Sequence, residues 1–355
     1  MTYKETLFFI GKCLTINHEN QNKLIVQEKL KSQSVDWDEV VKVSTSHYVF
    51  PALYCNLKKA DFITYLPEDL VEYMKHITDL NRERNQQIIE QAKEINSLLL
   101  ENNITPIFLK GTGNLLEGLY EDIAERMVGD IDFLVDEKDY NKSITIFYEN
   151  GYTEAIESDF HMPNFRHYNR LKKEERIAGI EIHKEMTKKQ YADEFNFKSI
   201  VDATFSIDNI SFLSFQDQLR LSIIAFQVND NGQYFKSISL RNAYDVFLLS
   251  QKTDSIKSIA TLKEKLQIPL NNFLTLVART LNASSVKNID NSDSEKYHTK
   301  YLELIENREL GKKFREKTSR KLFLKERLQI ILKAFYKKGY AIWLFNRLLK
   351  GRVDF

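Results

Sequence analysis

The sequence has few cysteines and no long apolar segment. Its 355 residues include only two cysteines, Cys13 and Cys55, which provide neither a disulfide framework nor zinc-ligand spacing. We expect both to be buried, reduced thiols. No apolar run approaches the roughly 20 residues that cross a bilayer, and the N-terminal segment lacks the basic start and cleavage site of a signal peptide. The sequence therefore predicts a globular cytoplasmic protein without a transmembrane segment.

Positive and negative charges nearly balance over the whole chain, but positive charges dominate its C-terminal segment. The formal net charge is +1. Residues 309–355 contain fourteen Lys or Arg and four Asp or Glu, so this tail carries a surplus of ten positive charges. Within it, residues 322–349 combine basic and aromatic side chains in a helical pattern. The pattern fits an amphipathic helical pair packed on the body, a helix peripheral to a membrane surface, or a surface for RNA or an acidic partner.

The composition, 43% hydrophobic and 28% charged, allows a sizeable core in two or three subdomains. Short strand patterns and helix patterns alternate in the middle of the chain, which indicates the α+β class. A long amphipathic helix is predicted over residues 68–102. The boundaries that we predict are a helical region at 1–103, an α+β core at 104–213, a helical domain at 214–308 and the basic aromatic tail at 309–355.

One segment in the predicted core combines glycines with the end of a strand pattern. The apolar run at residues 105–109 predicts a strand, and Lys110-Gly-Thr-Gly113 then reads as a glycine turn that opens a helix. Glycines let the backbone approach an anion closely, and free amides at a helix N-terminus attract phosphate. The G-K-[ST] ending of a Walker loop is missing. The segment therefore predicts a phosphate site of another kind.

Two aspartates follow on the next predicted strand. Asp130 and Asp132 alternate with Ile131 and Phe133, so the two carboxylates project from one face while the apolar side chains enter the core. Neighbouring carboxylates repel each other unless a cation lies between them. Magnesium binds through one or two carboxylates and takes its other ligands from water and substrate phosphates. A nucleotide is therefore the expected substrate.

These residues resemble the signature of nucleotidyltransferases of the DNA polymerase β type. That signature is an apolar residue, Gly, then Gly or Ser, a spacer and D-h-[D/E]-h; here Lys110-Gly111-Thr112 and Asp130-Ile-Asp132-Phe correspond to it, with Thr112 keeping a hydroxyl. More narrowly, L-K-G, L-Y and R-x-x-G-D-I-D-F-L-V are similar to a bacterial group of mostly uncharacterised nucleotidyltransferases. This group also carries a His-Pro segment and an E-[I/L]-H strand, here His161-Met-Pro163 and Glu181-Ile-His183. The resemblance covers about residues 100–250.

The resemblance implies a polymerase β-like core, a short mixed sheet with helices, flanked by helical regions. It also implies a third carboxylate on a neighbouring strand, for which Glu181 is the candidate and Glu185 the substitute. Glu181 and His183 alternate with Ile180 and Ile182 and so share one strand face. The implied catalytic and metal-binding residues are Asp130, Asp132 and Glu181, with two Mg²⁺ ions as cofactors; the implied nucleotide contacts are Lys110, Gly111, Thr112, Arg126, Arg241 and Asp245.

Several of these residues have a structural alternative. Lys110 and Arg126 can each bind a phosphate or form an ion pair within the protein, and Arg126 can instead hold the loop before Asp130. Arg241 and Asp245 resemble a helix packed beside the nucleotide, but a spacing of four is also that of a surface ion pair.

The histidines have alternatives of the same kind. His161 and His167 can line an acceptor pocket or lie at the surface, and His183 can orient Glu181 or contact the substrate.

The predicted activity is transfer of an NMP, by default AMP from ATP, to a hydroxyl group with release of pyrophosphate. The acceptor is expected to be a small molecule or a protein, because the core shows no basic groove. One alternative is a toxin-like transferase that acts on tRNA or protein and docks through the basic tail. The other is a catalytically inactive nucleotide-binding scaffold.

Overall fold

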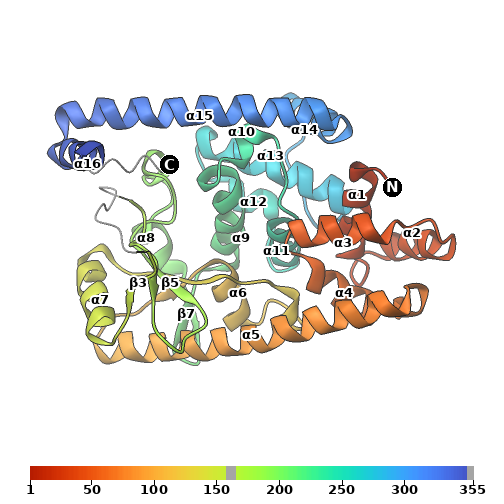
Figure 1. The fold of residues 1–355 in the computed structure, drawn as a ribbon, viewed down its shortest axis with the longest axis horizontal. Coiled ribbons are helices and arrows are strands. Elements are labelled where there is room, and N and C mark those ends of the chain that lie inside the picture. Colours follow the sequence, from red (N-terminus) through yellow and green to blue (C-terminus); the bar gives the residue numbers. More distant parts are fainter. Residues whose placement is uncertain (157–164, 350–355) are drawn as a thin grey trace.

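A mixed sheet of seven short strands lies between two long helices (Figure 1). The computed structural model describes residues 1–156 and 165–349. The strand order is β3-β4-β5-β2-β1-β7-β6. The combination of this sheet with many helices confirms the predicted α+β class. The strands are β1 (Ile107–Phe108), β2 (Asp130–Leu134), β3 (Thr153–Glu154), β4 (Leu171–Lys172), β5 (Gly179–His183), β6 (Phe205–Ile207) and β7 (Ile210–Phe212).

The two five-residue strands β2 and β5 are parallel neighbours at the centre of the sheet. Their register places Asp132 opposite Glu181. Ile131, Phe133 and Ile180 are fully buried, as the alternation in the sequence predicts. Antiparallel pairing with β1 on the other side of β2 fixes the strand further. Asp130 and Asp132 therefore lie on a strand that is paired on both sides.

Helices form most of the chain before and after the sheet. The predicted long helix is present as α5, and the regions before it and after β7 are almost entirely helical. Polar caps mark many of the starts; Ser214, for example, accepts from the backbone N–H of Asp217. The helices are α1 (Tyr3–Cys13), α2 (Asn20–Lys31), α3 (Trp37–Ser46), α4 (Phe50–Lys59), α5 (Glu68–Glu101), α6 (Lys110–Glu117), α7 (Glu137–Glu149), α8 (Phe197–Ile200), α9 (Phe215–Ile224), α10 (Gly232–Phe235), α11 (Leu240–Ser250), α12 (Ser255–Ala260), α13 (Glu264–Leu281), α14 (Ser292–Glu306), α15 (Arg308–Tyr336) and α16 (Lys338–Leu349).

The prediction that Lys110-Gly-Thr-Gly113 forms a turn before a helix is wrong, because Gly111 and Gly113 lie inside α6. The helix begins at Lys110, whose φ of 53° is unusual for a residue with a side chain. A Cβ atom at Gly113 would lie 2.7 Å from the carbonyl oxygen of Phe108 in β1. Gly113 thus allows α6 to turn back closely against the strand that precedes it.

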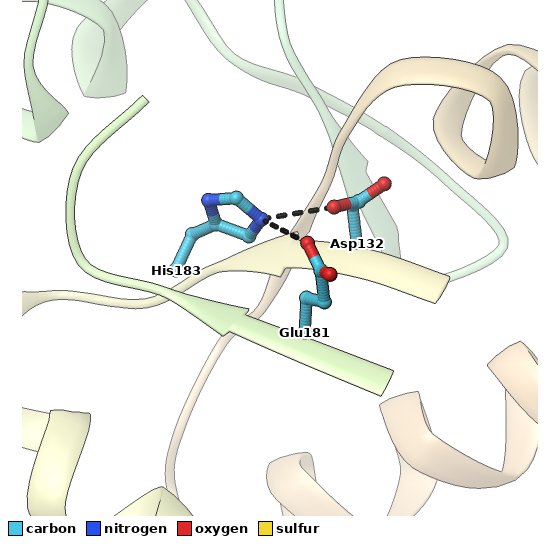
Figure 2. A group of neighbouring side chains, drawn as sticks. All are labelled: Asp132, Glu181 and His183. Atoms are coloured by element: carbon cyan, nitrogen blue, oxygen red, sulfur yellow. Dashed lines mark hydrogen bonds and ion pairs between the residues drawn. The ribbon is translucent and has the colours of Figure 1, made fainter. Parts of the chain in front are cut away.

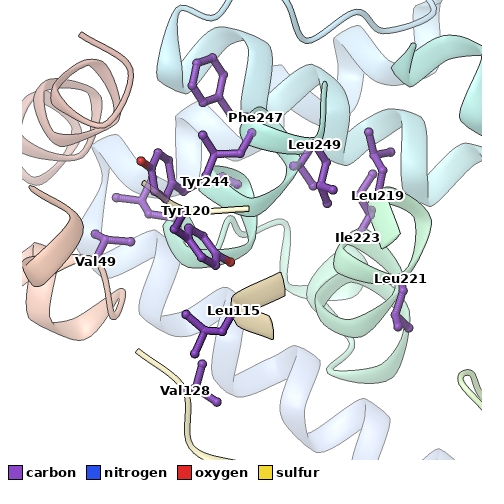
Figure 3. Packing of buried hydrophobic residues seen from close by; sticks show 14 of the residues in the cluster. Val49, Leu115, Tyr120, Val128, Leu219, Leu221, Ile223, Tyr244, Phe247 and Leu249 are labelled. Atoms are coloured by element: carbon purple, nitrogen blue, oxygen red, sulfur yellow. The ribbon is translucent and has the colours of Figure 1, made fainter. Parts of the chain in front are cut away.

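One continuous hydrophobic core joins the N-terminal helices, the sheet and the helices up to α14. Figure 3 shows the part where Leu115 and Tyr120 meet Tyr244 and Phe247 of α11. The long helix α5 runs along the opposite side of the molecule from α15 (Figure 1). The predicted division of the chain at residues 103, 213 and 308 stays a prediction.

The basic tail forms a helical hairpin of α15 and α16. A small separate cluster of Ile330, Tyr340 and Trp343 joins these two helices. Elsewhere α15 packs on α14 and α10. Among the described residues, no helix is both long enough and apolar enough to cross a membrane.

Candidate active site

The candidate site lies on β2 and β5, where neighbouring strands present acidic side chains to the same side. Asp132 is 8% exposed, whereas Asp130 at the start of β2 is more accessible. Helix α5 holds both strands through amide side chains. Asn85 donates to the carbonyl of Arg126 at 2.7 Å, and Gln91 both donates to and accepts from the backbone of Ala178, just before β5.

Asp132 is the most enclosed of the three acids. Its Oδ1 accepts from Lys110 Nζ at 2.7 Å and lies 2.9 Å from His183 Nε2 (Figure 2). Although burial opposes ionisation, the charge of Lys110 and the hydrogen bond from His183 hold the pKa of Asp132 well below its ordinary value. Asp132 is therefore a carboxylate at neutral pH.

Glu181 lies beside Asp132 and shares its histidine. The distance from Glu181 Oε2 to His183 Nε2 is 3.6 Å, and His167 Nε2 is 3.7 Å from the same oxygen. Burial opposes ionisation of Glu181, but the neighbouring imidazole of His183 leaves the pKa of Glu181 lowered overall. Burial, together with the charge of His183, lowers the pKa of His167 to about 4. His167, unlike a surface histidine, is part of the site.

Asp130 has a different neighbour from the other two acids. Arg170 Nη2 donates to Asp130 Oδ2 at 2.6 Å and lies 3.5 Å from Glu181 Oε1. Burial raises the pKa of Asp130 to about 6 against the opposing charge of Arg170. The backbone at Asp130 is held by Thr112, whose hydroxyl donates to its carbonyl at 2.8 Å. Thr112 thus ties α6 to β2 through its hydroxyl.

The best metal-ligand geometry involves Asp132, Glu181 and His183. One ligand atom from each of these three lies within 4.8 Å of the others. Asp130 stands beside this group and contacts Arg170 instead. Carboxylate oxygens suit magnesium or manganese, while the imidazole nitrogen also suits zinc and other transition metals. The residues present therefore fit a divalent cation. His183 is the ligand candidate that the sequence did not single out.

A cavity of about 200 Å³ opens in front of the acids. One wall comes from β2, β5 and the start of α6, and the other from the segment between α9 and α10 and from α11. Of the nine catalytic, metal-binding and nucleotide-binding residues that the resemblance implies, eight line this cavity; the exception is Thr112. The charged lining residues are Lys110, Arg126, Asp130, Asp132, Arg166, Glu181, Asp230, Arg241 and Asp245.

Arg126 and Asp245 form a buried ion pair. Arg126 Nε donates to both carboxylate oxygens of Asp245, at 3.0 and 3.1 Å, and its guanidinium also donates to the carbonyl of Met127. Tyr120 donates to the same carboxylate at 2.7 Å. Arg126 thus takes part in an ion pair within the protein, one of the alternatives stated above, and its bond to Met127 also holds the loop before Asp130. Asp245 therefore pairs with Arg126 from a distant segment. The alternative of a pair between Arg241 and Asp245 within the helix is not what the structure shows.

Arg241 and Arg166 both line the cavity, and each has a guanidinium nitrogen without a hydrogen-bond partner in the described chain. Within the described chain, Nε of each arginine is buried without a hydrogen bond, as is Oδ1 of Asn229. Each arginine rests on an aromatic ring, Arg241 on Tyr48 and Arg166 on Phe165. Sequence reasoning missed Arg166, Asn229 and Asp230, because no motif links these positions. The only local signal for Arg166 is its position next to His167.

Not every predicted residue falls in this site. His161 lies outside the described residues. Glu185, the substitute for Glu181, follows the end of β5, and its carboxylate oxygen Oε2 is buried without a hydrogen bond within the described chain. Gly111 lines the cavity, and a Cβ atom there would come 3.0 Å from Val128 and 3.4 Å from Arg126.

Comparison with known proteins gives one family match. Residues 33–283, more than half of the chain, match a family described as uncharacterised nucleotidyltransferase. Neither a search of curated proteins nor a search of solved structures returned a match. The matched range contains the whole sheet, the three acids and both walls of the cavity. The chain therefore belongs to the uncharacterised nucleotidyltransferase family.

Proposed function

We propose that this protein is a metal-dependent nucleotidyltransferase that transfers an NMP from an NTP to a hydroxyl group and releases pyrophosphate. ATP is the default donor, so the transferred group is AMP by default. The acceptor in this proposal is a small molecule or a protein. The family supports the general reaction, while the donor, the acceptor, the metal and the residue roles belong to the proposal.

The observation that carries the proposal is the charge arrangement around the cavity. Three acids from adjacent strands form one wall, and two arginines with unpartnered Nε atoms stand in the cavity lining. In total five acidic and four basic residues line it, so an NTP without cations would meet an excess of negative charge. A nucleotide carrying divalent cations matches both walls, because the acids bind the cations and the arginines bind phosphate oxygens.

Asp130, Asp132 and Glu181 are the residues that would hold two magnesium ions. His183 offers a further ligand atom beside Asp132 and Glu181, and Asp130 would exchange Arg170 for a cation. Bound magnesium would neutralise the phosphate charge and favour the ionised form of an attacking hydroxyl. The role of the protein is then mainly positioning. Lys110 and Arg170 keep the acids oriented when no cation is bound, and Asn85 and Gln91 of α5 hold the two strands in register.

Lys110, Gly111, Arg166 and Arg241 are the residues that we assign to phosphate binding. Lys110 and Gly111 belong to the first turn of α6, where backbone N–H groups have no partner within the helix. Arg126 and Asp245 contribute indirectly, because their mutual ion pair anchors the loop that leads to Asp130. Thr112 also contributes indirectly, because its hydroxyl holds the carbonyl of Asp130.

The test is incubation with α-labelled ATP, GTP, CTP and UTP in the presence of magnesium or manganese, with and without cell lysate. We expect pyrophosphate release and transfer of label, both lost in Asp130→Ala and retained in the exposed control Glu137→Ala. The labelled product identifies the acceptor, and label in tRNA would favour the toxin-like alternative. No turnover with any NTP would refute the proposal.

The catalytically inactive scaffold has one observation in its favour. Each acid already has a cationic or histidine neighbour: Lys110 for Asp132, Arg170 for Asp130, and His183 for Glu181. A protein that only senses nucleotide would bind it with magnesium and show no turnover. Equilibrium binding measured beside the transfer assay separates the two functions.

A further inference from the structure

The hairpin of α15 and α16 exposes an unusual amount of apolar surface. Of the 23 exposed large hydrophobic side chains among the described residues, ten lie between residues 323 and 349. On α15, Leu324, Leu328, Ile331 and Phe335 follow one another at spacings of four, three and four, which puts them on one helix face. Their exposed fractions are 65%, 58%, 45% and 84%.

Helix α16 presents a second stripe of the same kind. Ile342, Phe345 and Leu349 are spaced by three and four residues and are 49%, 62% and 69% exposed. The contact between the two helices is made by other residues, namely Ile330, Tyr340 and Trp343. Packing of the hairpin therefore leaves both stripes without cover from the described chain.

Basic side chains flank the apolar stripe. Residues 321–349 include seven Lys or Arg and a single acid, Glu326. Lys321 and Lys325 lie seven and three residues before Leu328, so they border one edge of the stripe. Lys325 also lies over the ring of Tyr234 in α10. Within the described chain, neither lysine forms an ion pair. The surface thus combines exposed aliphatic groups with a net excess of positive charge.

We infer that the α15–α16 hairpin binds the surface of an anionic phospholipid bilayer. A helix with an apolar stripe and basic borders lies in the interface with its stripe at the acyl boundary and its lysines among the headgroups. RNA would use the basic groups and stack on aromatic rings, but it would leave Leu324, Leu328 and Ile331 in water. Both the charge and the aliphatic stripe therefore favour the lipid surface.

This inference is independent of the nucleotide chemistry, because the hairpin lies outside the cavity. The hairpin and the cavity are nevertheless connected through α10. Helix α15 packs on α10, and α10 directly follows Asn229 and Asp230 of the cavity lining. A bilayer bound along the hairpin would therefore lie on the same side of the molecule as α10, opposite the long helix α5.

The experiment is co-sedimentation of the full-length protein with vesicles of phosphatidylcholine alone and of phosphatidylcholine mixed with phosphatidylglycerol. We expect binding to the mixed vesicles that weakens as salt is added. The variant Leu328→Gln/Phe335→Gln should lower the affinity by at least about tenfold, since two large apolar groups no longer enter the bilayer. Lys321→Gln/Lys325→Gln should also weaken binding and reduce its dependence on anionic lipid.

Matched controls replace residues of the same types elsewhere on the surface. Leu24→Gln/Leu80→Gln removes two leucines that are 67% and 49% exposed on α2 and α5, and Lys31→Gln/Lys93→Gln removes two exposed lysines. Both controls should bind as the wild type does. No vesicle binding, or equal binding by the hairpin variants, would overturn the inference. So would concentration-dependent dimerisation or tRNA binding that the hairpin variants abolish while vesicle binding is unchanged.

Discussion

At the scale of single residues, every acid of the candidate site has a basic neighbour. Sequence reasoning identified Asp130, Asp132 and Glu181 but treated them as mutually repelling groups that wait for a metal. Lys110 and Arg170 supply positive charge among these acids in the described structure. Their contacts could not be predicted, because they depend on side chains that the fold brings together from separate elements.

Replacement of Asp132 should therefore affect both rate and stability. In Asp132→Asn, Lys110 and His183 lose a charged partner in a buried place, which we expect to lower the free energy of unfolding by about 1–3 kcal/mol. Nucleotidyl transfer should fall by about a hundredfold or more, because the cation that would stabilise the reacting phosphate loses a carboxylate ligand. Chemical denaturation and initial rates measure the two effects. Normal turnover with an unchanged metal requirement would exclude a catalytic role for Asp132.

The unpartnered arginines of the cavity lead to a prediction about substrate binding. Arg166→Gln and Arg241→Gln should each raise the KM for the NTP by about tenfold, because a charged hydrogen bond to phosphate contributes roughly 1.5–3 kcal/mol. The turnover number should change less. Arg176→Gln serves as the control, because Arg176 pairs with Glu94 on the surface. Equal KM values in all three variants would show that the cavity arginines do not bind the substrate.

At the scale of elements, strong local patterns predicted α5, β2 and β5. Polar and apolar residues alternate over Asp130–Phe133 and Gly179–His183, which predicted the two strands, and the periodic apolar positions of residues 68–102 predicted the helix. The prediction for Gly111 and Gly113 was wrong, because the sequence alone does not distinguish a glycine that allows close packing from a glycine in a turn. Gly113 is required by the approach of α6 to Phe108, which is a tertiary contact.

His47 joins three elements, and its protonation should weaken them. Its Nδ1 accepts from the backbone N–H of Leu240 at the start of α11, and its Nε2 lies 3.1 Å from the hydroxyl of Tyr3. Burial lowers the pKa of His47 to about 4. The ring is therefore neutral in the folded protein at neutral pH, whereas an unfolded histidine binds a proton near pH 6.5.

The stability that neutral His47 supports is thus complete above about pH 6.5 and is lost as the pH falls towards 4. We expect the free energy of unfolding of the wild type to drop more steeply over this range than that of His47→Gln. The difference should reach about 3 kcal/mol at the acidic end. Urea titrations at several pH values measure it, and parallel profiles for the two proteins would contradict the assignment.

At the scale of the whole molecule, the cavity is the feature that the sequence could not provide. Its second wall comes from Asn229, Asp230 and α11, more than 40 residues beyond the end of β5. Only Arg241 and Asp245 were expected there, from the family resemblance. The family match over residues 33–283 includes the residues of both walls, whereas the short motif around Asp130 includes those of one wall only.

The separate cluster in the hairpin predicts that the tail can be removed without loss of the body. A chain that ends at Lys321 should unfold within about 4 °C of the full-length protein, because Ile330, Tyr340 and Trp343 lie outside the main core. Nucleotidyl transfer to a soluble acceptor should persist. Thermal unfolding and the label-transfer assay are the measurements, and a collapse of the melting temperature would show that the hairpin supports the body.

Helix α5 places a length constraint on the sequence. Asn85 holds the loop that leads into β2, and Gln91 holds the residue before β5, so six positions of one helix set the spacing between two acid-bearing strands. One inserted residue between them would rotate Gln91 by about 100° and shift it by about 1.5 Å. Insertions and deletions in natural or engineered relatives should therefore avoid this interval and accumulate instead in the turns between elements.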